Sequence, residues 1–258
     1  MDKPTLIVTG ASRGIGKSIV LLAIKSLDAN VIGIARSKEG LERISQELAA
    51  LQLADRFKFM DGDIAEKTTA DKAVKIAEES WSGQIHGLVH NAAVIDPLST
   101  IANAPVDQWR KTFDINFFSV LTLVQLALPS LRENKGRIIL VNSGAATYPV
   151  NGWGAYCSSK AALKMFGEIL AKEESEVTTV SVLPGIVDTE MQTAIREKGQ
   201  ANMTSEHHAY FVDSYTNEKL LHPDDPGHVI AALAVNGASS LNGQFLSWDD
   251  EELKAYRQ

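Results

Sequence analysis

Short, unbroken apolar runs alternate with longer segments of helical periodicity along most of this chain, and this alternation constrains the fold more than any other feature. The first run spans 5–9 and precedes a glycine turn and a helical segment over 15–27, and the second spans 31–35 and precedes a helical segment over 38–51. Strands of a parallel sheet are unbroken in this way because helices cover both of their faces. The pattern therefore predicts a doubly wound α/β fold, with a parallel sheet between two layers of helices.

The same alternation continues to the end of the chain. Pro129 is expected to kink or end a long helix at 107–131, because proline lacks the N–H that an interior helical position needs. Neither a linker nor a break in composition divides the sequence, so residues 1–258 are predicted to form a single domain. The further predicted strands are 57–60, 87–90, 137–142, 178–183 and 244–246, and the other helices are 66–81, 155–174 and 226–235.

Residues 186–226 depart from the alternation. They are polar, include His207, His208 and His222, and show no sustained strand pattern. Connections of this length are usually functional, as lids or binding loops. We therefore predict a substrate lid here. Adjacent residues of a helix face apart, so His207 and His208 are expected to be solvated, and no metal site is expected.

Charge and composition exclude several classes of function. The chain has 45% hydrophobic and 22% charged residues, which is typical of a soluble globular protein. Its net charge of -7 argues against binding to nucleic acid or a membrane surface, since both require basic patches. Neither a signal peptide nor an apolar run of about 18 residues is evident. Cys157 is the sole cysteine, which excludes an internal disulfide, and we expect a cytoplasmic protein.

A glycine-rich turn, 9–16 (TGASRGIG), links the first predicted strand to the first predicted helix. Glycines allow the backbone to turn sharply and to approach a pyrophosphate at the helix N-terminus, where unpaired N–H groups attract anions. Ala11 occupies a position that is glycine in a P-loop, so a P-loop is excluded. The turn predicts a dinucleotide-binding (Rossmann) site. Its expected contact residues are Gly10, Ser12, Arg13, Gly14, Ile15 and Gly16.

The residue after the second strand indicates which dinucleotide binds. An acidic residue at this position would hydrogen-bond the ribose 2′-hydroxyl of NAD, but here Arg36 follows the strand and the first carboxylate is Glu39. Arg36, assisted by Arg13 and by Ser12 or Ser37, would instead pair with a 2′-phosphate through charge-assisted hydrogen bonds. The alternative is that Arg36 is a solvated residue at a helix start. We predict NADP(H) as the cofactor.

Four polar residues form a candidate catalytic set. Tyr156 and Lys160 lie one turn apart on one face of a predicted helix. Ser143 precedes Tyr156 by 13 residues and follows the strand at 137–142, and ligands of open α/β sheets bind beyond such strand ends. Asn116 is a polar amide within an apolar helical stretch. The combination is far more specific than any one of its members.

These motifs resemble those of the short-chain dehydrogenase/reductase family, in its NADP-preferring form. The resemblance runs in family order from residue 9 to 189 and so covers most of the chain. The sequence departs from the family pattern at His90, where asparagine is frequent, and at Ala93, where glycine is frequent. The other matching segments are Asp63-Ile64, Asn91-Ala92-Ala93 and Pro184-Gly185.

The resemblance implies a role for each residue of the catalytic set. Tyr156 would donate a proton to the carbonyl oxygen in reduction, or accept one in oxidation. Lys160 would hold the nicotinamide ribose, and its ammonium would lower the pKa of the phenol from its ordinary value of about 10. Ser143 would hydrogen-bond the substrate oxygen, and Asn116 would organise the helix and a water for proton relay.

The resemblance also implies further cofactor contacts and an oligomer. Asp63 and Ile64 would meet the adenine, and Asn91 with Ala92 the adenosine ribose. The nicotinamide carboxamide would contact the segment of Pro184, Gly185, Val187 and Thr189. A homodimer or homotetramer is expected through the helices at 107–131 and 155–174.

The substrate pocket is expected between the loop at 144–154 and the start of the lid. Tyr148, Trp153 and Met191 would form an apolar, partly aromatic wall, which favours hydrophobic ketones or diketones over charged substrates. The segments 187–191 and 241–245 resemble the branch of the family that contains sepiapterin and benzil reductases. Cys157 is expected to serve in packing.

Two alternatives remain open. One is an NADP(H)-dependent polyol or sugar-alcohol dehydrogenase, and the other is a non-enzymatic NADP(H) sensor. The intact set of Asn116, Ser143, Tyr156 and Lys160 argues against the sensor, because a sensor has no use for a proton donor.

Overall fold

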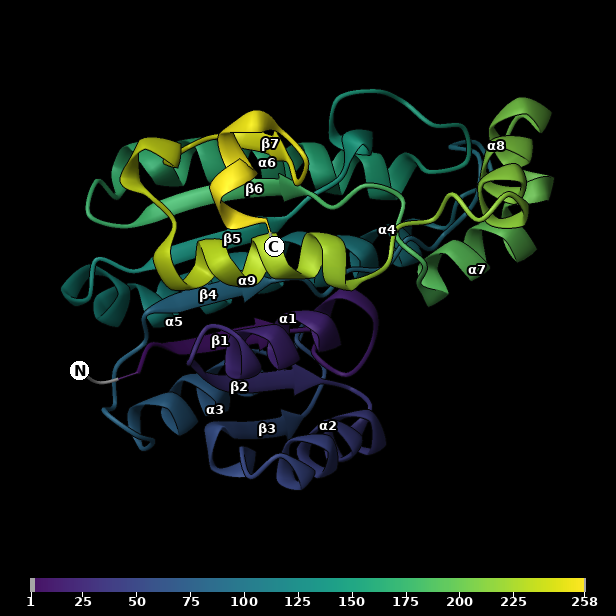
Figure 1. Ribbon diagram of the computed structural model, residues 1–258. Helices are drawn as coiled ribbons and strands as arrows, with labels where there is room; N and C mark the ends of the chain where they lie inside the picture. Colours follow the sequence, from purple (N-terminus) through teal and green to yellow (C-terminus); the bar gives the residue numbers. More distant parts are fainter. Residues whose placement is uncertain (1–2, 258) are drawn as a thin grey trace.

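Seven parallel strands form the sheet of the computed structural model, which describes residues 3–257. The strand order is β3-β2-β1-β4-β5-β6-β7 (Figure 1), so the predicted doubly wound sheet is confirmed. Met1, Asp2 and Gln258 lie outside the described residues, and with them the start of the chain, where no signal peptide was expected. The strands are β1 Thr5–Thr9, β2 Asn30–Ala35, β3 Phe57–Asp61, β4 Gly87–His90, β5 Arg137–Val141, β6 Thr178–Leu183 and β7 Phe245–Ser247.

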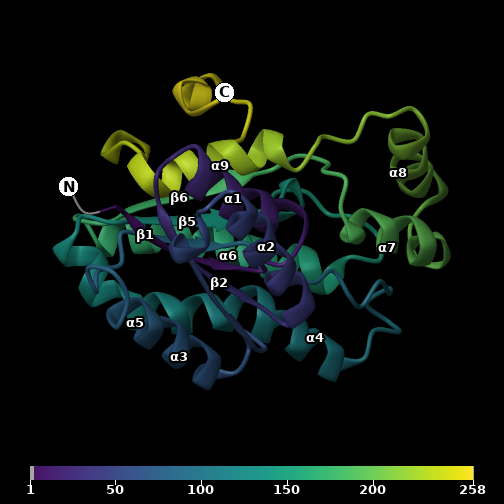
Figure 2. The same ribbon diagram turned by 60° about the horizontal axis from the view of Figure 1, so that its bottom comes forward.

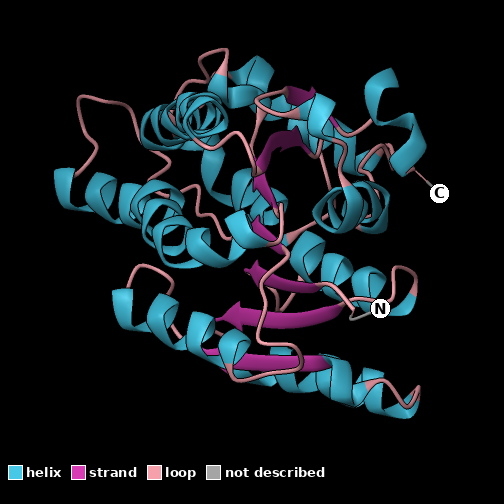
Figure 3. Ribbon diagram, turned by 90° about the vertical axis from the view of Figure 1, so that its left-hand side faces the viewer, coloured by secondary structure: helices cyan, strands magenta, loops and turns pink. Residues whose placement is uncertain are grey.

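Helices cover both faces of the sheet (Figures 2 and 3), and the strands are apolar on both sides for this reason. In β1, Leu6 and Val8 pack against one helical layer, while Ile7 packs against the other. The first layer consists of α1 Gly14–Lys25, α2 Lys38–Ala50 and α9 Asp224–Asn236. The second consists of α3 Lys67–Glu78, α5 Ser119–Glu133 and α6 Gly154–Glu173.

The predicted long helix at 107–131 differs from the structure in one respect. It comprises α4 Val106–Phe113, a π-helical turn at Asp114–Phe118, and then α5, which contains Pro129 in its interior. The helix therefore does not end at Pro129, one of the two outcomes expected from the sequence, but continues to Glu133. A proline costs a helix interior roughly 3 kcal/mol, and burial of the apolar face of α5 outweighs this cost, since each large side chain contributes about 1.5–3 kcal/mol. The buried apolar side chains are Val120, Leu123, Val124, Ala127 and Leu131.

The same helical segment, 106–133, is long and apolar enough to cross a membrane by length and mean hydropathy, which is 1.4 in its most apolar window. The sequence prediction overlooked it because polar residues interrupt the apolar run. Here it packs against α3 and β4 as a core helix of the α/β fold. Its composition therefore reflects burial against the sheet.

The predicted lid is helical. Between β6 and α9, the chain forms α7 Glu190–Lys198 and α8 Ser205–Thr216, which project beyond the carboxyl ends of the strands, at the right of Figure 1. Val187 forms an isolated bridge with Leu221 and so joins the two ends of this segment. The lid therefore stands over the sheet edge where ligands of this fold bind.

Candidate active site

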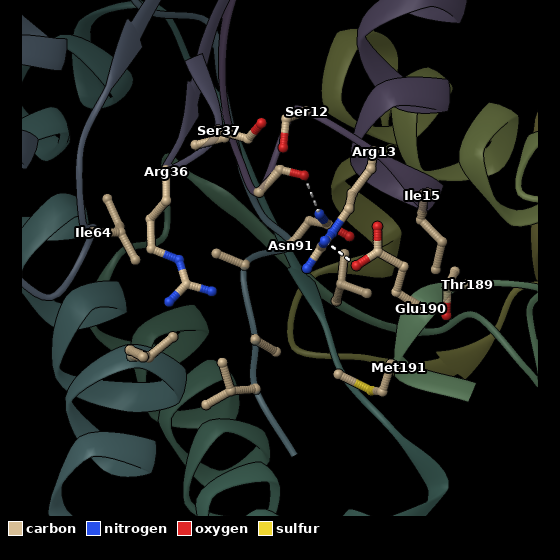
Figure 4. A pocket seen from close by; sticks show the side chains of 18 of the residues that line it. Ser12, Arg13, Ile15, Arg36, Ser37, Ile64, Asn91, Thr189, Glu190 and Met191 are labelled. Atoms are coloured by element: carbon tan, nitrogen blue, oxygen red, sulfur yellow. Dashed lines mark hydrogen bonds and ion pairs between the residues drawn. The ribbon is translucent and has the colours of Figure 1, made fainter. Parts of the chain in front are cut away.

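A cleft of about 980 Å³ runs along the carboxyl ends of the strands, near the upper end of the roughly 300–1,000 Å³ range of ligand pockets. It lies where the strand order reverses between β1 and β4, the position at which doubly wound folds bind nucleotides. The register pairs Val8 with Val89, so the glycine turn after β1 and the loop after β4 leave the sheet side by side. Figure 4 shows the side chains that line the cleft.

The glycine turn forms a backbone cradle at the start of α1. Gly10 and Gly14 have φ values of 66° and 51°, in the left-handed region that favours glycine. A Cβ at Gly16 would lie 2.1 Å from the Gly10 carbonyl oxygen, so the turn can close only with glycine there. No side chain caps α1 at Arg13, and the first N–H groups of the helix stay available for an anion. The residues present therefore fit a dinucleotide pyrophosphate.

Asn91 holds this turn in place. Its Nδ2 donates to the carbonyl oxygens of Thr9 at 3.1 Å and of Gly10 at 3.3 Å, and its backbone N donates to Thr9 Oγ1 at 3.1 Å. The backbone N of Ala92 donates to the same hydroxyl at 3.0 Å. The amide donors of Asn91 are thus used within the protein, so its side chain organises the cradle and has only Oδ1 left to meet a ribose.

Arg36 and Arg13 lie in different electrostatic surroundings. Arg36 is exposed, lines the cleft and forms no ion pair within the described part of the chain. The Arg13 guanidinium forms an ion pair with Glu190 at the start of α7, across the cleft (Figure 4). Ser37 caps α2 by accepting from Gly40 N at 3.2 Å. Arg36 is therefore the arginine free to receive a phosphate, and the expected assistance from Arg13 requires exchange with Glu190.

Most of the remaining expected cofactor residues line the cleft, and two do not. Asp63, Ile64, Ala92, Pro184 and Thr189 line the cleft, together with Ser12 and Ile15 from the glycine turn. Gly185 has a φ of 78°, which favours glycine, and Val187 is buried. Gly185 and Val187 thus shape the loop after β6 and do not themselves line the cleft.

Ser143, Tyr156 and Lys160 converge beyond the end of β5, as the sequence predicts. The Ser143 side chain hydrogen-bonds the Tyr156 phenol, and Ser143 Oγ also accepts from Ala145 N at 3.2 Å. Lys160 Nζ donates to the carbonyl oxygen of Val141 at 2.8 Å and lies 5.8 Å from the centroid of the Tyr156 ring. Tyr156 and Lys160 line the cleft, and Ser143 lies beside Tyr156.

The protonation of Tyr156 differs from the sequence expectation. Burial raises the pKa of Tyr156 to about 12, while the hydrogen bond from Ser143 acts in the opposite direction. Burial also lowers the pKa of Lys160 to about 8. The acidification of the phenol expected from Lys160 is therefore outweighed by desolvation. At neutral pH, the phenol holds its proton and is ready to donate it.

Asn116 lies in the π-helical turn and is fully buried. Its Oδ1 accepts from Val94 N at 2.9 Å, and its Nδ2 donates to Val94 O at 2.9 Å and to Ser159 Oγ at 3.0 Å. The π-turn was not predicted from the sequence, and these bonds account for it, since the Asn116 side chain ties the turn to the loop after β4 and to α6. Both side-chain N–H groups of Asn116 are thus used within the protein.

Of the three residues expected to form the substrate wall, Met191 lines the cleft, and Trp153 belongs to a buried apolar cluster that includes Tyr156. Trp153 is buried, with its ring centroid 5.8 Å from that of Tyr156 in an edge-on arrangement and 5.4 Å from that of Phe211 in α8. Tyr148 is 58% exposed, so it forms part of the rim and not the wall. Phe211, which the sequence prediction missed, packs against the cluster that contains Trp153 and Tyr156.

Two other site residues were not predicted. Asn142 is buried, lines the cleft, and accepts from Ser143 N at 2.8 Å through Oδ1, so it fixes the backbone beside Ser143. Its position in the sequence, directly before Ser143, could have identified it as a site residue. Glu190 was missed because nothing in the sequence indicates that it faces Arg13.

The side chains of His207, His208 and Cys157 are partly buried. His207 and His208 are half-buried, and His208 Nε2 lies 2.9 Å from the carbonyl oxygen of Arg196, so the expected solvation is wrong. Cys157 is half-buried and packs against the aromatic cluster, as expected. Among residues 3–257, no group of three or more His, Cys, Asp or Glu side chains could hold a metal ion.

The doubly wound sheet and the cleft at the carboxyl ends of its strands are typical of nucleotide-dependent oxidoreductases. Residues 4–200 match the family model described as short chain dehydrogenase. The chain belongs to the short-chain dehydrogenase/reductase family, whose members use NAD(P)(H). The family predicted from the sequence motifs is thereby confirmed.

Relatives in Saccharomyces cerevisiae resemble the chain over nearly its whole length. The oxidoreductase YIR035C is 41% identical over 251 residues, covering 96% of each chain, and its crystal structure matches with a TM-score of 0.93 over 99% of this chain and 100% of that one. Benzil reductase ((S)-benzoin forming) IRC24 is 38% identical over 259 residues, covering 96% of this chain and 97% of its own. A solved structure described as a cytoplasmic protein with unknown function is 39% identical, with a TM-score of 0.82 and coverage of 99% and 100%. These relatives support carbonyl reduction as the general reaction.

Proposed function

We propose that this protein reduces an apolar or aromatic ketone or diketone to the alcohol, with NADPH as the hydride source and Tyr156 as the proton donor. The observation that carries the proposal is the buried, protonated Tyr156 phenol, which hydrogen-bonds Ser143 and packs against Trp153. A proton donor is thus positioned in an apolar pocket at one end of a nucleotide-sized cleft.

The side chains would divide the chemical work between them. NADPH, when bound, supplies the hydride to the carbonyl carbon. The Ser143 hydroxyl hydrogen-bonds the substrate oxygen, where negative charge develops, and Tyr156 passes its phenolic proton to that oxygen. Lys160 has one N–H bonded to Val141 O, which leaves two donors for the ribose hydroxyls and a charge that stabilises the phenolate.

Tyr156 supports reduction as the direction of the reaction, and Arg36 supports NADPH as the cofactor. With a pKa of about 12, Tyr156 is in the protonated form that reduction requires, whereas oxidation would need the phenolate. Arg36 supports NADPH over NADH, because it lines the cleft after β2 where an NAD enzyme would carry a carboxylate. Asp63, Ile64 and the loop from Pro184 to Thr189 would hold the adenine and the nicotinamide ends.

The substrate class rests on the shape of the pocket and on the relatives. Trp153, Phe211 and Met191 belong to an apolar cluster that includes Tyr156, and Met191 extends this cluster into the cleft. Proteins named benzil reductase are 38% identical in yeast and 30% identical in Bacillus cereus. An aromatic diketone of the benzil type, or a pterin with a diketone side chain, would pack against this cluster. A polyol would leave its hydroxyl groups unpaired there.

We further propose that the chain is a single domain that acts in the cytoplasm as a homodimer or homotetramer. One continuous sheet spans the described residues, which supports the single domain. Phe118, Met165 and Ile169 expose apolar surface along the two long helices, which supports association there.

The test is NADPH consumption with benzil, other aromatic ketones and sepiapterin, set against NADP⁺ reduction with polyols and sugar alcohols. We expect turnover of the diketones and little with the polyols. Tyr156→Phe should retain NADPH binding and lose at least about a hundredfold in kcat, since general acid catalysis contributes about 10²–10⁴. Preference for a polyol would support the dehydrogenase, and NADPH binding without any turnover would support the sensor. Near-normal turnover by Tyr156→Phe would exclude the mechanism.

A further inference from the structure

We propose that His90 and Ser119 are positioning residues. They hold the π-helical turn around Asn116 and thereby fix the rotation of α5 relative to α4 that the active site requires. His90 is the last residue of β4, where the family frequently has asparagine, and Ser119 is the first residue of α5. Both side chains are buried. They act through Asn116, so the inference rests on the proposed function for its kinetic test only.

A chain of two hydrogen bonds links β4 to the π-turn. The Ser119 hydroxyl donates to the carbonyl oxygen of Ile115 at 2.6 Å. Nε2 of His90 lies 2.9 Å from the same Ser119 Oγ. A serine hydroxyl has a single proton and a carbonyl only accepts, so Nε2 of His90 carries a hydrogen and donates to Oγ. The chain therefore runs from His90 through Ser119 to the residue directly before Asn116.

The imidazole is suited to this task because it stays neutral. Burial, with a smaller contribution from the nearby Lys160 ammonium, lowers the pKa of His90 to about 3. The ring thus keeps one protonation state throughout the working range of pH. A neutral donor also adds no second positive charge beside Lys160.

The segment from His90 to Val94, at the end of β4, contacts the π-turn at two points. On one side, Val94 binds both ends of the Asn116 amide at 2.9 Å. On the other side, His90 reaches the turn through Ser119. A π-turn accommodates one extra residue, so its loss would rotate α5 against α4 by about 100°. Because His90 and Val94 both belong to the exit of β4, their combined contacts fix the turn against that rotation.

The experiment compares four single variants. Ser119→Ala removes the link with little change in volume, and His90→Phe keeps a ring without a donor. His90→Gln restores an N–H near the position of Nε2 and should rescue activity, whereas the shorter His90→Asn should not. The control is Thr122→Ala, since Thr122 Oγ1 donates to Phe118 O at 3.0 Å one turn further along the helix, in an exposed position.

We expect Ser119→Ala and His90→Phe to lower kcat about tenfold with little change in the Kd of NADPH, and Thr122→Ala to match wild type. In the Asn116→Ala background, Ser119→Ala should add no further loss, because both changes act through the same turn. Wild-type kcat in Ser119→Ala, or losses that multiply in the double variant, would overturn the inference.

A readout that needs no turnover separates this inference from the proposed function. Amide hydrogen exchange over residues 114–120 should accelerate at least tenfold in Ser119→Ala and remain unchanged in Thr122→Ala. Unchanged exchange in both would overturn the inference even if the protein reduces diketones. Accelerated exchange would uphold the positioning of the turn even if the substrate belongs to another class.

Discussion

At the residue scale, desolvation sets the charge states at the catalytic centre. Burial raises the pKa of Tyr156 to about 12 and lowers the pKa of Lys160 to about 8. Both shifts favour the neutral forms, as expected for groups removed from water. The Ser143 hydrogen bond opposes the shift at Tyr156. The site therefore combines a firmly held proton with an ammonium that can be lost in mildly alkaline solution.

The pH dependence of reduction should follow Lys160. Its ammonium is charged below a pKa of about 8 and neutral above it, and the charged form is needed to stabilise the phenolate. We expect kcat for diketone reduction to be constant below this pKa and to fall as the pH rises through it. Steady-state rates across this range, with melting temperatures recorded at each pH to exclude unfolding, will measure the effect. A rate that rises with pH would contradict it.

Arg36 should determine the choice of cofactor. Arg36→Asp would remove a charge-assisted hydrogen bond worth about 1.5–3 kcal/mol and place a carboxylate where it would accept a hydrogen bond from the ribose 2′-hydroxyl of NAD. We expect the ratio of kcat/KM for NADPH to that for NADH to fall by about ten- to a hundredfold. Arg43→Asp, further along α2 on an exposed position, is the matched control. An unchanged ratio in Arg36→Asp would refute the 2′-phosphate assignment.

At the element scale, the start of α7 is joined to the glycine turn by the Arg13–Glu190 ion pair. Both side chains are largely exposed, and such pairs contribute about 0.2–1 kcal/mol. The pair nevertheless occupies an arginine that a cofactor phosphate would attract. The lid helix and the cofactor therefore compete for Arg13.

Glu190→Gln should tighten NADPH binding by about two- to fivefold, because it frees Arg13 and removes a negative charge beside the phosphates. Fluorescence titration will give the Kd, and added salt should reduce the difference between variant and wild type. Glu197→Gln, at the far end of α7, is the control. Weaker binding by Glu190→Gln would show that the ion pair supports the cofactor-binding form.

At the scale of the whole molecule, apolar surface along the two long helices predicts association. Phe118 and Met165 are 51% and 54% exposed, although both belong to helices whose other faces lie in the core. We expect Phe118→Glu combined with Met165→Glu to shift the protein to a monomer, as measured by light scattering after gel filtration. Tyr210→Glu, on the lid, should leave the mass unchanged. A monomeric wild type would exclude the predicted oligomer.

The sequence by itself determined the layered sheet, its strand positions and the glycine turn that borders the cleft. These are local properties, since unbroken apolar runs form buried strands, and glycines at 10, 14 and 16 form a turn that other residues cannot. The tertiary structure alone decided the π-turn at Asn116, the retention of Pro129 within α5, the pairing of Arg13 with Glu190, and the pKa of Tyr156. Each of these depends on contacts or desolvation between segments far apart in the chain, which local patterns do not encode.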